Sequence, residues 1–240
     1  MVNDSVMSDV VLSVIVAFGM LQMVWFSVML VRRGVSPTMI QQAIPPFLAV
    51  WVLMWPVYVD VRWLAVGLFI LAIPIALAAV VKSPFWQHLR IAWGGQDSVS
   101  KDTTHPHVTL LPQLHLLFSL AVAGAWFQTI PEFGFGLALC LCVAFPAAYW
   151  VDYVSQRYGF FVLGFPAHPE QTLAGHLILI VMCTILLCWS LHVYHGTDWQ
   201  LLLIATLIVS IVASACRAIV AKQWNAFVAM LGMGAVMWLL

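Results

Sequence analysis

The most regular feature of the chain is a succession of long apolar stretches separated by short polar ones. Each apolar stretch is about 17 to 25 residues long, which suits an α-helix crossing a hydrocarbon layer about 30 Å thick and exceeds a barrel strand of about ten residues. The pattern predicts eight transmembrane helices, at about residues 8–31, 43–59, 63–81, 108–128, 133–151, 172–194, 199–220 and 224–240. We therefore expect an all-α integral membrane protein with a single transmembrane domain over residues 1–240.

Two polar segments interrupt this pattern. Residues 83–107 first mix aromatic and basic side chains and then become hydrophilic, which is typical of an interfacial helix followed by a solvated loop; a plain polar loop is the alternative. Residues 152–175 hold two acids, an arginine, a histidine and three glycines between two predicted helices. We expect chemistry in this second segment, because polar groups at a helix junction can meet water or lipid headgroups.

Composition and charge support a membrane protein and predict its orientation. The chain is 64% hydrophobic and 8% charged, and its nine basic and nine acidic residues balance, so nothing indicates a nucleic-acid partner. If Arg32 and Arg33 are cytoplasmic, eight of the nine basic residues fall on that side, as the positive-inside rule requires. This predicts both termini outside, segments 83–107 and 152–175 on the cytoplasmic side, and a bacterial-type cytoplasmic (inner) membrane.

Asp152 is the central candidate for a functional residue. An acid at the end of a membrane helix is costly unless it has a partner or a metal. Ser155 shares the helix face of Asp152, and Gly159 lets the backbone approach a phosphate or another helix. Arg157 follows five residues after Asp152 and could form an interfacial ion pair with it at the helix end.

Metal binding is a further hypothesis. Asp152 could share a metal with His168 and Glu170, which follow in the same segment. His115 and His176 are expected at similar depth, where they could ligate iron, copper or a haem if their helices are neighbours; ordinary interfacial histidines are the alternative. The cysteines all lie in apolar stretches and are interpreted as small buried side chains, not as disulfide partners: Cys140, Cys142, Cys183, Cys188 and Cys216.

The polar segment also resembles a known family. It reads as D-x-x-S-x-x-x-G, a proline-containing loop and the start of an apolar helix, carried by Asp152, Ser155, Gly159, Pro166, Pro169, Thr172 and Gly175. This pattern, with Asn225 opening the last helix, resembles the CTP-dependent lipid enzymes of membranes: dolichol and phytol kinases and, more distantly, phosphatidate cytidylyltransferases. The resemblance covers roughly the last hundred residues. It implies CTP and Mg²⁺ as cofactors, with Asp152, Arg157 and Glu170 catalytic, and Ser155, Gly159, Thr172 and Gly175 at the nucleotide.

The chain departs from the family pattern at four positions. Val151 precedes the aspartate instead of glycine, Gln171 and Ala174 stand where the family has lysine and glutamate, and Trp224 replaces an aspartate. Transfer of a phosphoryl or nucleotidyl group needs carboxylates for Mg²⁺ and cations for the developing charge. We therefore expect a protein that acts on or binds a membrane lipid with an eroded active site; if active, it is a CTP-dependent lipid phosphotransferase or nucleotidyltransferase.

Two other functions remain open at this point. One is a non-catalytic membrane subunit that binds lipid or partner membrane subunits, which the missing lysine and acids favour. The other is a haem- or metal-binding membrane subunit, for which the histidine pair is the indication.

Overall fold

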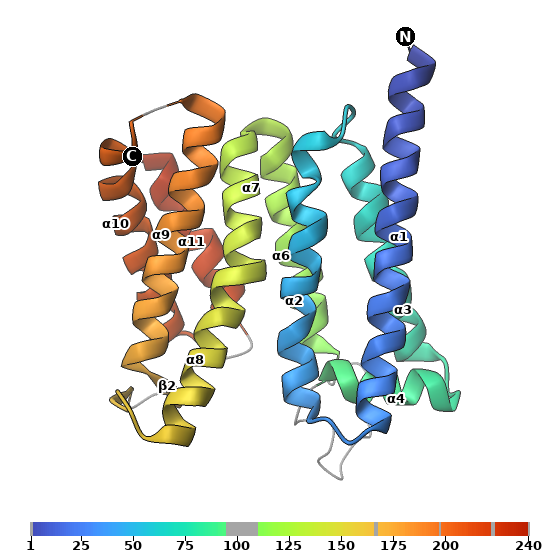
Figure 1. The fold of residues 1–240 in the computed structure, drawn as a ribbon, viewed down its shortest axis with the longest axis horizontal. Helices are drawn as coiled ribbons and strands as arrows, with labels where there is room; N and C mark the ends of the chain where they lie inside the picture. The colour runs from blue at the N-terminus through green and yellow to red at the C-terminus, as the bar shows by residue number, and fades with distance from the viewer. Residues whose placement is uncertain (1, 95–109, 166–167, 197, 222–223, 240) are drawn as a thin grey trace. The chain divides into compact units, whose positions relative to one another are not determined.

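The computed structural model describes residues 2–94, 110–165, 168–196, 198–221 and 224–239. Nearly all of them are helical, as the apolar pattern predicts (Figure 1). Contacts divide the chain into two compact units, Met1–Ala121 and Val122–Leu240. Helix α6 (Leu111–Thr129) begins in the first unit and ends in the second.

Besides the start of α6, the described residues of the first unit form four α-helices. They are α1 (Val2–Arg32), α2 (Pro37–Leu53) followed by the 3₁₀ turn η1 (Trp55–Val57), α3 (Trp63–Val80) and α4 (Pro84–Gly94). Helix α2 begins six residues earlier than the apolar pattern predicts, so the pair Pro45 and Pro46 lies in the middle of the helix and not near its start. Membrane helices tolerate such prolines when neighbouring groups satisfy the freed carbonyls.

Helix α4 confirms the helical interpretation of the start of segment 83–107; residues 95–107 lie outside the described residues. It runs crosswise to α1 and α2 at the end where α1 finishes (Figure 1). The Trp93 indole donates to the Ser27 hydroxyl of α1 at 3.1 Å, and the Arg90 side chain donates to the Ala78 carbonyl of α3 at 2.9 Å. Trp93, one of the aromatic side chains of this segment, is therefore buried against the protein's own helices and not exposed to lipid.

An acidic residue near the start of α1, Asp9, links this helix to the turn before α3. Asp9 is only 2% exposed. Its two carboxylate oxygens accept hydrogen bonds from the backbone N–H groups of Val59, at 2.9 Å, and Asp60, at 3.0 Å. The carboxylate therefore joins α1 to the turn between η1 and α3, and its desolvation is offset by two charge-assisted bonds.

Replacing Asp9 by alanine should lower the free energy of unfolding by about 2 kcal/mol, because two backbone N–H groups lose their acceptor in a part-buried site. The measurement is an SDS titration in mixed micelles. Asp60→Ala in the same turn is the matched control. Among the described residues its exposed carboxylate accepts from the Arg62 N–H alone, so water can replace the carboxylate and the loss should stay below about 0.5 kcal/mol. Equal losses for the two variants would refute the role of Asp9.

The second unit contains the rest of α6 and a long composite helix. This helix consists of α7 (Pro131–Leu139), the π-helical turn η3 (Cys140–Ala144) and α8 (Phe145–Tyr158). A short antiparallel pair of strands follows, β1 (Gly164–Phe165) and β2 (His168–Thr172). The unit ends with α9 (Leu173–His195), α10 (Trp199–Ile219) and α11 (Asn225–Leu239). Helix α9 packs against both α8 and α10 (Figure 1).

Six helices in the described part of the chain are long and apolar enough to cross a membrane: Val6–Arg32, Pro37–Val57, Trp63–Val80, Pro131–Tyr158, Leu173–Tyr194 and Trp199–Ile219. The other two predicted spans also form helices. However, α11 has only 15 residues, and α6 is less apolar than these six because it includes Gln113, His115 and Gln128. The fold is thus that of an all-α integral membrane protein.

The predicted boundary at residue 151 is wrong. Helix α8 continues to Tyr158, so the first residues of segment 152–175 are helical, and β1 and β2 occupy part of what the polarity predicts to be a loop. The physical reason is that Asp152 and Ser155 are buried on the inner face of α8. Their polarity therefore does not mark the end of the helix.

Candidate functional site

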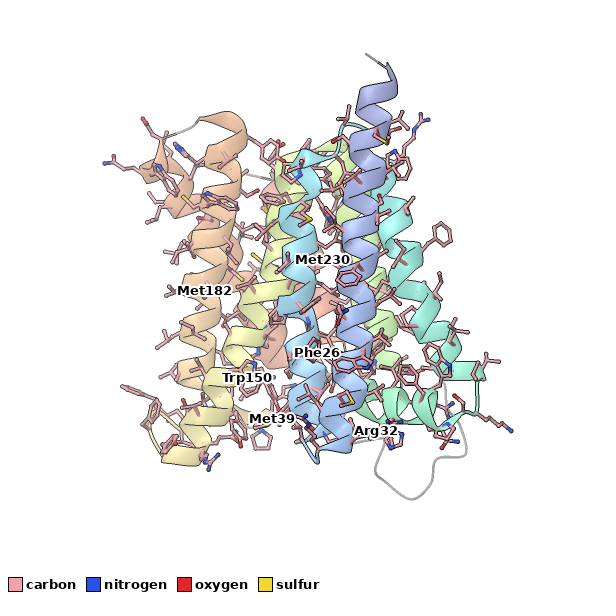
Figure 2. The ribbon with its side chains drawn as sticks, turned by 45° about the vertical axis from the view of Figure 1, so that its right-hand side comes forward. Phe26, Arg32, Met39, Trp150, Met182 and Met230 are labelled. Carbon is pink, nitrogen blue, oxygen red and sulfur yellow. The ribbon has the colours of Figure 1, made fainter. Side chains whose placement is uncertain are left out.

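Asp152 lies two residues beyond Trp150, which is labelled on α8 in Figure 2. Its carboxylate is buried, with 3% of the residue exposed. One oxygen, Oδ1, accepts hydrogen bonds from both the backbone N–H and the hydroxyl of Thr172, each at 2.8 Å. The other oxygen, Oδ2, forms an ion pair with Arg217, near the end of α10. One side chain of α8 thus holds the start of α9 and the end of α10.

The first turn of α9 is shaped around this carboxylate. Thr172 is the N-cap residue, and its hydroxyl accepts a hydrogen bond from the backbone N–H of Gly175 at 3.2 Å. A Cβ atom on Gly175 would overlap the carboxylate of Asp152. Glycine is therefore required here for a close approach of helices, and the negative charge lies at the positive end of the α9 dipole.

A second set of hydrogen bonds lies beside the ion pair. The side-chain nitrogen Nε2 of Gln171 donates to the backbone carbonyl of Arg217 at 3.0 Å. The Oε1 atom of Gln171 is 3.0 Å from Nε2 of His176, and Nδ1 of His176 is 2.8 Å from the hydroxyl of Ser214 on α10. We call Asp152, Gln171, Thr172, His176, Ser214 and Arg217 the polar cluster.

Two buried polar atoms close to these bonds have no partner among the described residues. They are Nη1 of Arg217 and the hydroxyl oxygen of Ser155, whose residues are 5% and 0% exposed. Unpaired buried donors are rare in native proteins, because each costs about 1–3 kcal/mol. Arg217 and Ser155 therefore retain hydrogen-bonding capacity that the described residues do not use.

The arrangement opposes binding of Mg²⁺ at Asp152. Three donors already occupy the carboxylate, and the guanidinium of Arg217 cancels its charge. A metal ion would have to displace Arg217 and leave it buried without a counter-ion, which is strongly unfavourable.

Arg157 does not form the predicted ion pair; Asp152 pairs with Arg217 instead. Arg157 is exposed, and its nearest described polar contact is the Tyr153 hydroxyl at 3.5 Å. Five residues along an α-helix correspond to a rotation of about 140° away from the starting face. Arg157 therefore points away from the side of α8 that carries Asp152, whereas Ser155 shares that buried side as predicted.

Glu170 and His168 interact with each other across 3.8 Å and do not join Asp152. Alternate residues of a strand face opposite sides, so Glu170 is part-exposed while Gln171 is buried in the polar cluster. In the described segments no group of three or more His, Cys, Asp and Glu side chains could hold a metal. The predicted three-residue metal site is therefore not formed.

The remaining candidates have local explanations. Gly159 ends α8 with a φ of 72°, the left-handed conformation that favours glycine at a helix end. Both ring nitrogens of His176 are occupied by Gln171 and Ser214, so neither is left for iron or copper. His115 belongs to the other compact unit, where its backbone carbonyl accepts from Ser119.

The sequence interpretation missed Arg217 and Ser214. A signal for Arg217 was available: it is a basic residue in the last turn of an apolar helix, and a charge in such a position is expected to have a partner of opposite sign. Asp152 and Arg217 are two such charges of opposite sign, so the same expectation would have paired them. The role of Ser214 had no comparable signal, since serine is common on membrane helices.

The fold and the polar cluster define an all-α integral membrane protein with a buried ion pair at one end of three packed helices. No protein-family model matches the chain, and no curated protein or solved structure is detectably similar to it.

Proposed function

We propose that this protein binds a membrane lipid and keeps the arrangement of the CTP-dependent lipid kinases without catalysing CTP-dependent transfer. The observation that carries this proposal is the state of Asp152. The carboxylate that the family resemblance assigns to Mg²⁺ is buried and occupied by Thr172 and Arg217.

The charges in the polar cluster are unsuited to CTP-dependent phosphoryl transfer, which supports the second part of the proposal. Phosphoryl transfer relies on metal ions and cationic side chains that offset charge on the phosphates. Here Asp152 and Arg217 neutralise each other. Gln171 is neutral at the position of the family lysine, and its amide is used by Arg217 and His176.

Lipid binding is supported by an apolar groove in the second unit. The groove has a volume of about 510 Å³ and lies between α6, the turn after it, α7 and α11. It is lined by Trp126, Ile130, Phe133, Leu231, Gly234, Ala235, Trp238 and Leu239. Its size is within the range of ligand pockets. A lining of this kind suits an acyl or isoprenoid chain, because it offers apolar contact and aromatic rings.

Calorimetry with CTP and Mg²⁺ on the purified protein in lipid nanodiscs should give no saturable heat, because Asp152 has no free position for the metal. Radiolabelled CTP should likewise transfer no label to an isoprenoid alcohol or to phosphatidate. Native mass spectrometry should show lipid retained by the protein.

The control variant is Asp152→Asn, which should behave like the wild type towards CTP. Saturable binding of CTP and Mg²⁺ that Asp152→Asn abolishes would overturn the proposal in favour of an active transferase. Stoichiometric co-purification of partner subunits without retained lipid would favour the non-catalytic subunit instead.

A further inference from the structure

The hydrogen bonds of His176 define the protonation of its ring. Because Nε2 of Gln171 donates to the carbonyl of Arg217, Oε1 of Gln171 faces Nε2 of His176. An amide oxygen only accepts, so Nε2 of His176 carries the proton. In the neutral ring Nδ1 is then the acceptor, and the Ser214 hydroxyl donates to it at 2.8 Å.

Ser214 differs in this from the other hydroxyl residues on the same side of α10. The hydroxyls of Thr206 and Ser210 both donate to carbonyls of the preceding turn of their own helix, each at 2.7 Å, which is the ordinary bond for such residues in a helix. Ser214 instead donates to a histidine of the neighbouring helix. A serine, a histidine acceptor and a third residue that orients the ring are the parts of an activated nucleophile.

Arg217 supplies the missing electrostatic element. It follows Ser214 by three residues on α10, which places both on one face of the helix. Its Nη2 atom is engaged by Asp152, whereas Nη1 is buried and has no partner among the described residues. A donor that is held in place by an ion pair, three residues from a nucleophile on the same helix, is suited to stabilise a developing oxyanion.

The depth of Ser214 indicates the substrate class. Ser214 is half-buried and precedes the end of α10, at Ile219, by about 7–8 Å at 1.5 Å per residue. Helix α10 has 21 residues and is therefore about as long as the hydrocarbon layer is thick. Ser214 thus lies close to the boundary between acyl chains and headgroups, the level at which lipid esters join the two.

We propose that Ser214 is a nucleophile that attacks the carbonyl carbon of a membrane-lipid carboxylic ester, with His176 as general base. As Oγ bonds to carbon, its proton passes to Nδ1 of His176, and Nη1 of Arg217 donates to the oxyanion. The intermediate then expels the lipid alcohol, which takes the proton from His176, and leaves an acyl ester on Ser214 that water hydrolyses. The inference rests on the proposed function, because a lipid has to reach these helices.

The test uses a long-chain alkyl fluorophosphonate, which phosphonylates activated serines and needs neither CTP nor Mg²⁺. Added to the full-length protein in nanodiscs, it should shift the intact mass by one adduct, mapped to Ser214 by peptide sequencing. Ser214→Ala should abolish the adduct. Ser210→Ala, one turn away on the same helix, is the matched control and should label at the wild-type rate.

His176→Gln separates an activated serine from a merely accessible one. Loss of the general base should slow labelling by at least about 100-fold, while elution on gel filtration and intrinsic tryptophan fluorescence show whether the fold is kept. Absence of an adduct on the wild type, or an adduct that persists in Ser214→Ala, overturns the inference. Either result leaves the calorimetric test of CTP binding unaffected, so the two proposals fail separately.

Discussion

Replacing Arg217 by methionine lowers the free energy of unfolding by about 3–5 kcal/mol, the largest loss that we expect from a single side chain. The variant removes the cation that faces Asp152, so a buried carboxylate is left with Thr172 as its only described partner. The methylene stem of the arginine is replaced at similar volume, so the loss reports the charge and not a cavity. The measurement is the SDS titration in mixed micelles used for Asp9.

Two further variants test the cause of this loss. Arg157→Met removes an exposed arginine from the same unit and should cost less than about 0.5 kcal/mol. The double variant Asp152→Asn with Arg217→Met should recover most of the stability, because the asparagine still accepts from Thr172 but carries no charge. If Arg217→Met and Arg157→Met unfold alike, the ion pair does not hold these helices together.

The second large effect concerns Gly134, near the start of α7. A Cβ atom there would overlap the carbonyl oxygen of Ala123 and the backbone of Phe127 in α6. Backbone atoms cannot rotate away as a side chain does, so Gly134→Ala has to separate the two helices. We expect a loss of about 3 kcal/mol, measured as a fall in the SDS midpoint at unchanged far-ultraviolet helicity.

Gly19→Ala provides the control for this substitution. Gly19 lies within α1, and a Cβ atom built there meets nothing within 4 Å. Alanine should therefore raise the free energy of unfolding by about 0.5–1 kcal/mol through its higher helix propensity. Destabilisation by both substitutions would show that the contact between α6 and α7 is not the cause.

The helices could be predicted from the sequence because their signal is local. Hydropathy over about 20 residues depends only on composition, and the predicted start of α3 at Trp63 is that of the structure. The interpretation of the cysteines also holds, since four are buried and Cys216 is partly so. The end of α8 could not be predicted this way, because its polar residues are satisfied by α9 and α10, which lie later in the chain.

The candidate site was predicted only in part for the same reason. Asp152, Thr172 and Gly175 were identified from one short segment and do meet in space. Arg217 is 65 residues away from Asp152 along the chain, so no local pattern links the two. Charge alone also suggested the wrong neighbour, Arg157, because sequence proximity does not indicate which face of a helix a residue occupies.

The π-helical turn η3 determines which face of α8 carries Asp152. A π turn contains one residue more than the corresponding α-helical path, so it advances every later residue of α8 by about 100° around the helix axis. Asp152 faces α9 and α10 only because the extra residue lies between Cys140 and Ala144. The position of the carboxylate is thus encoded in the number of residues that precede it, and a single deletion in this turn would move it as surely as a substitution would remove it.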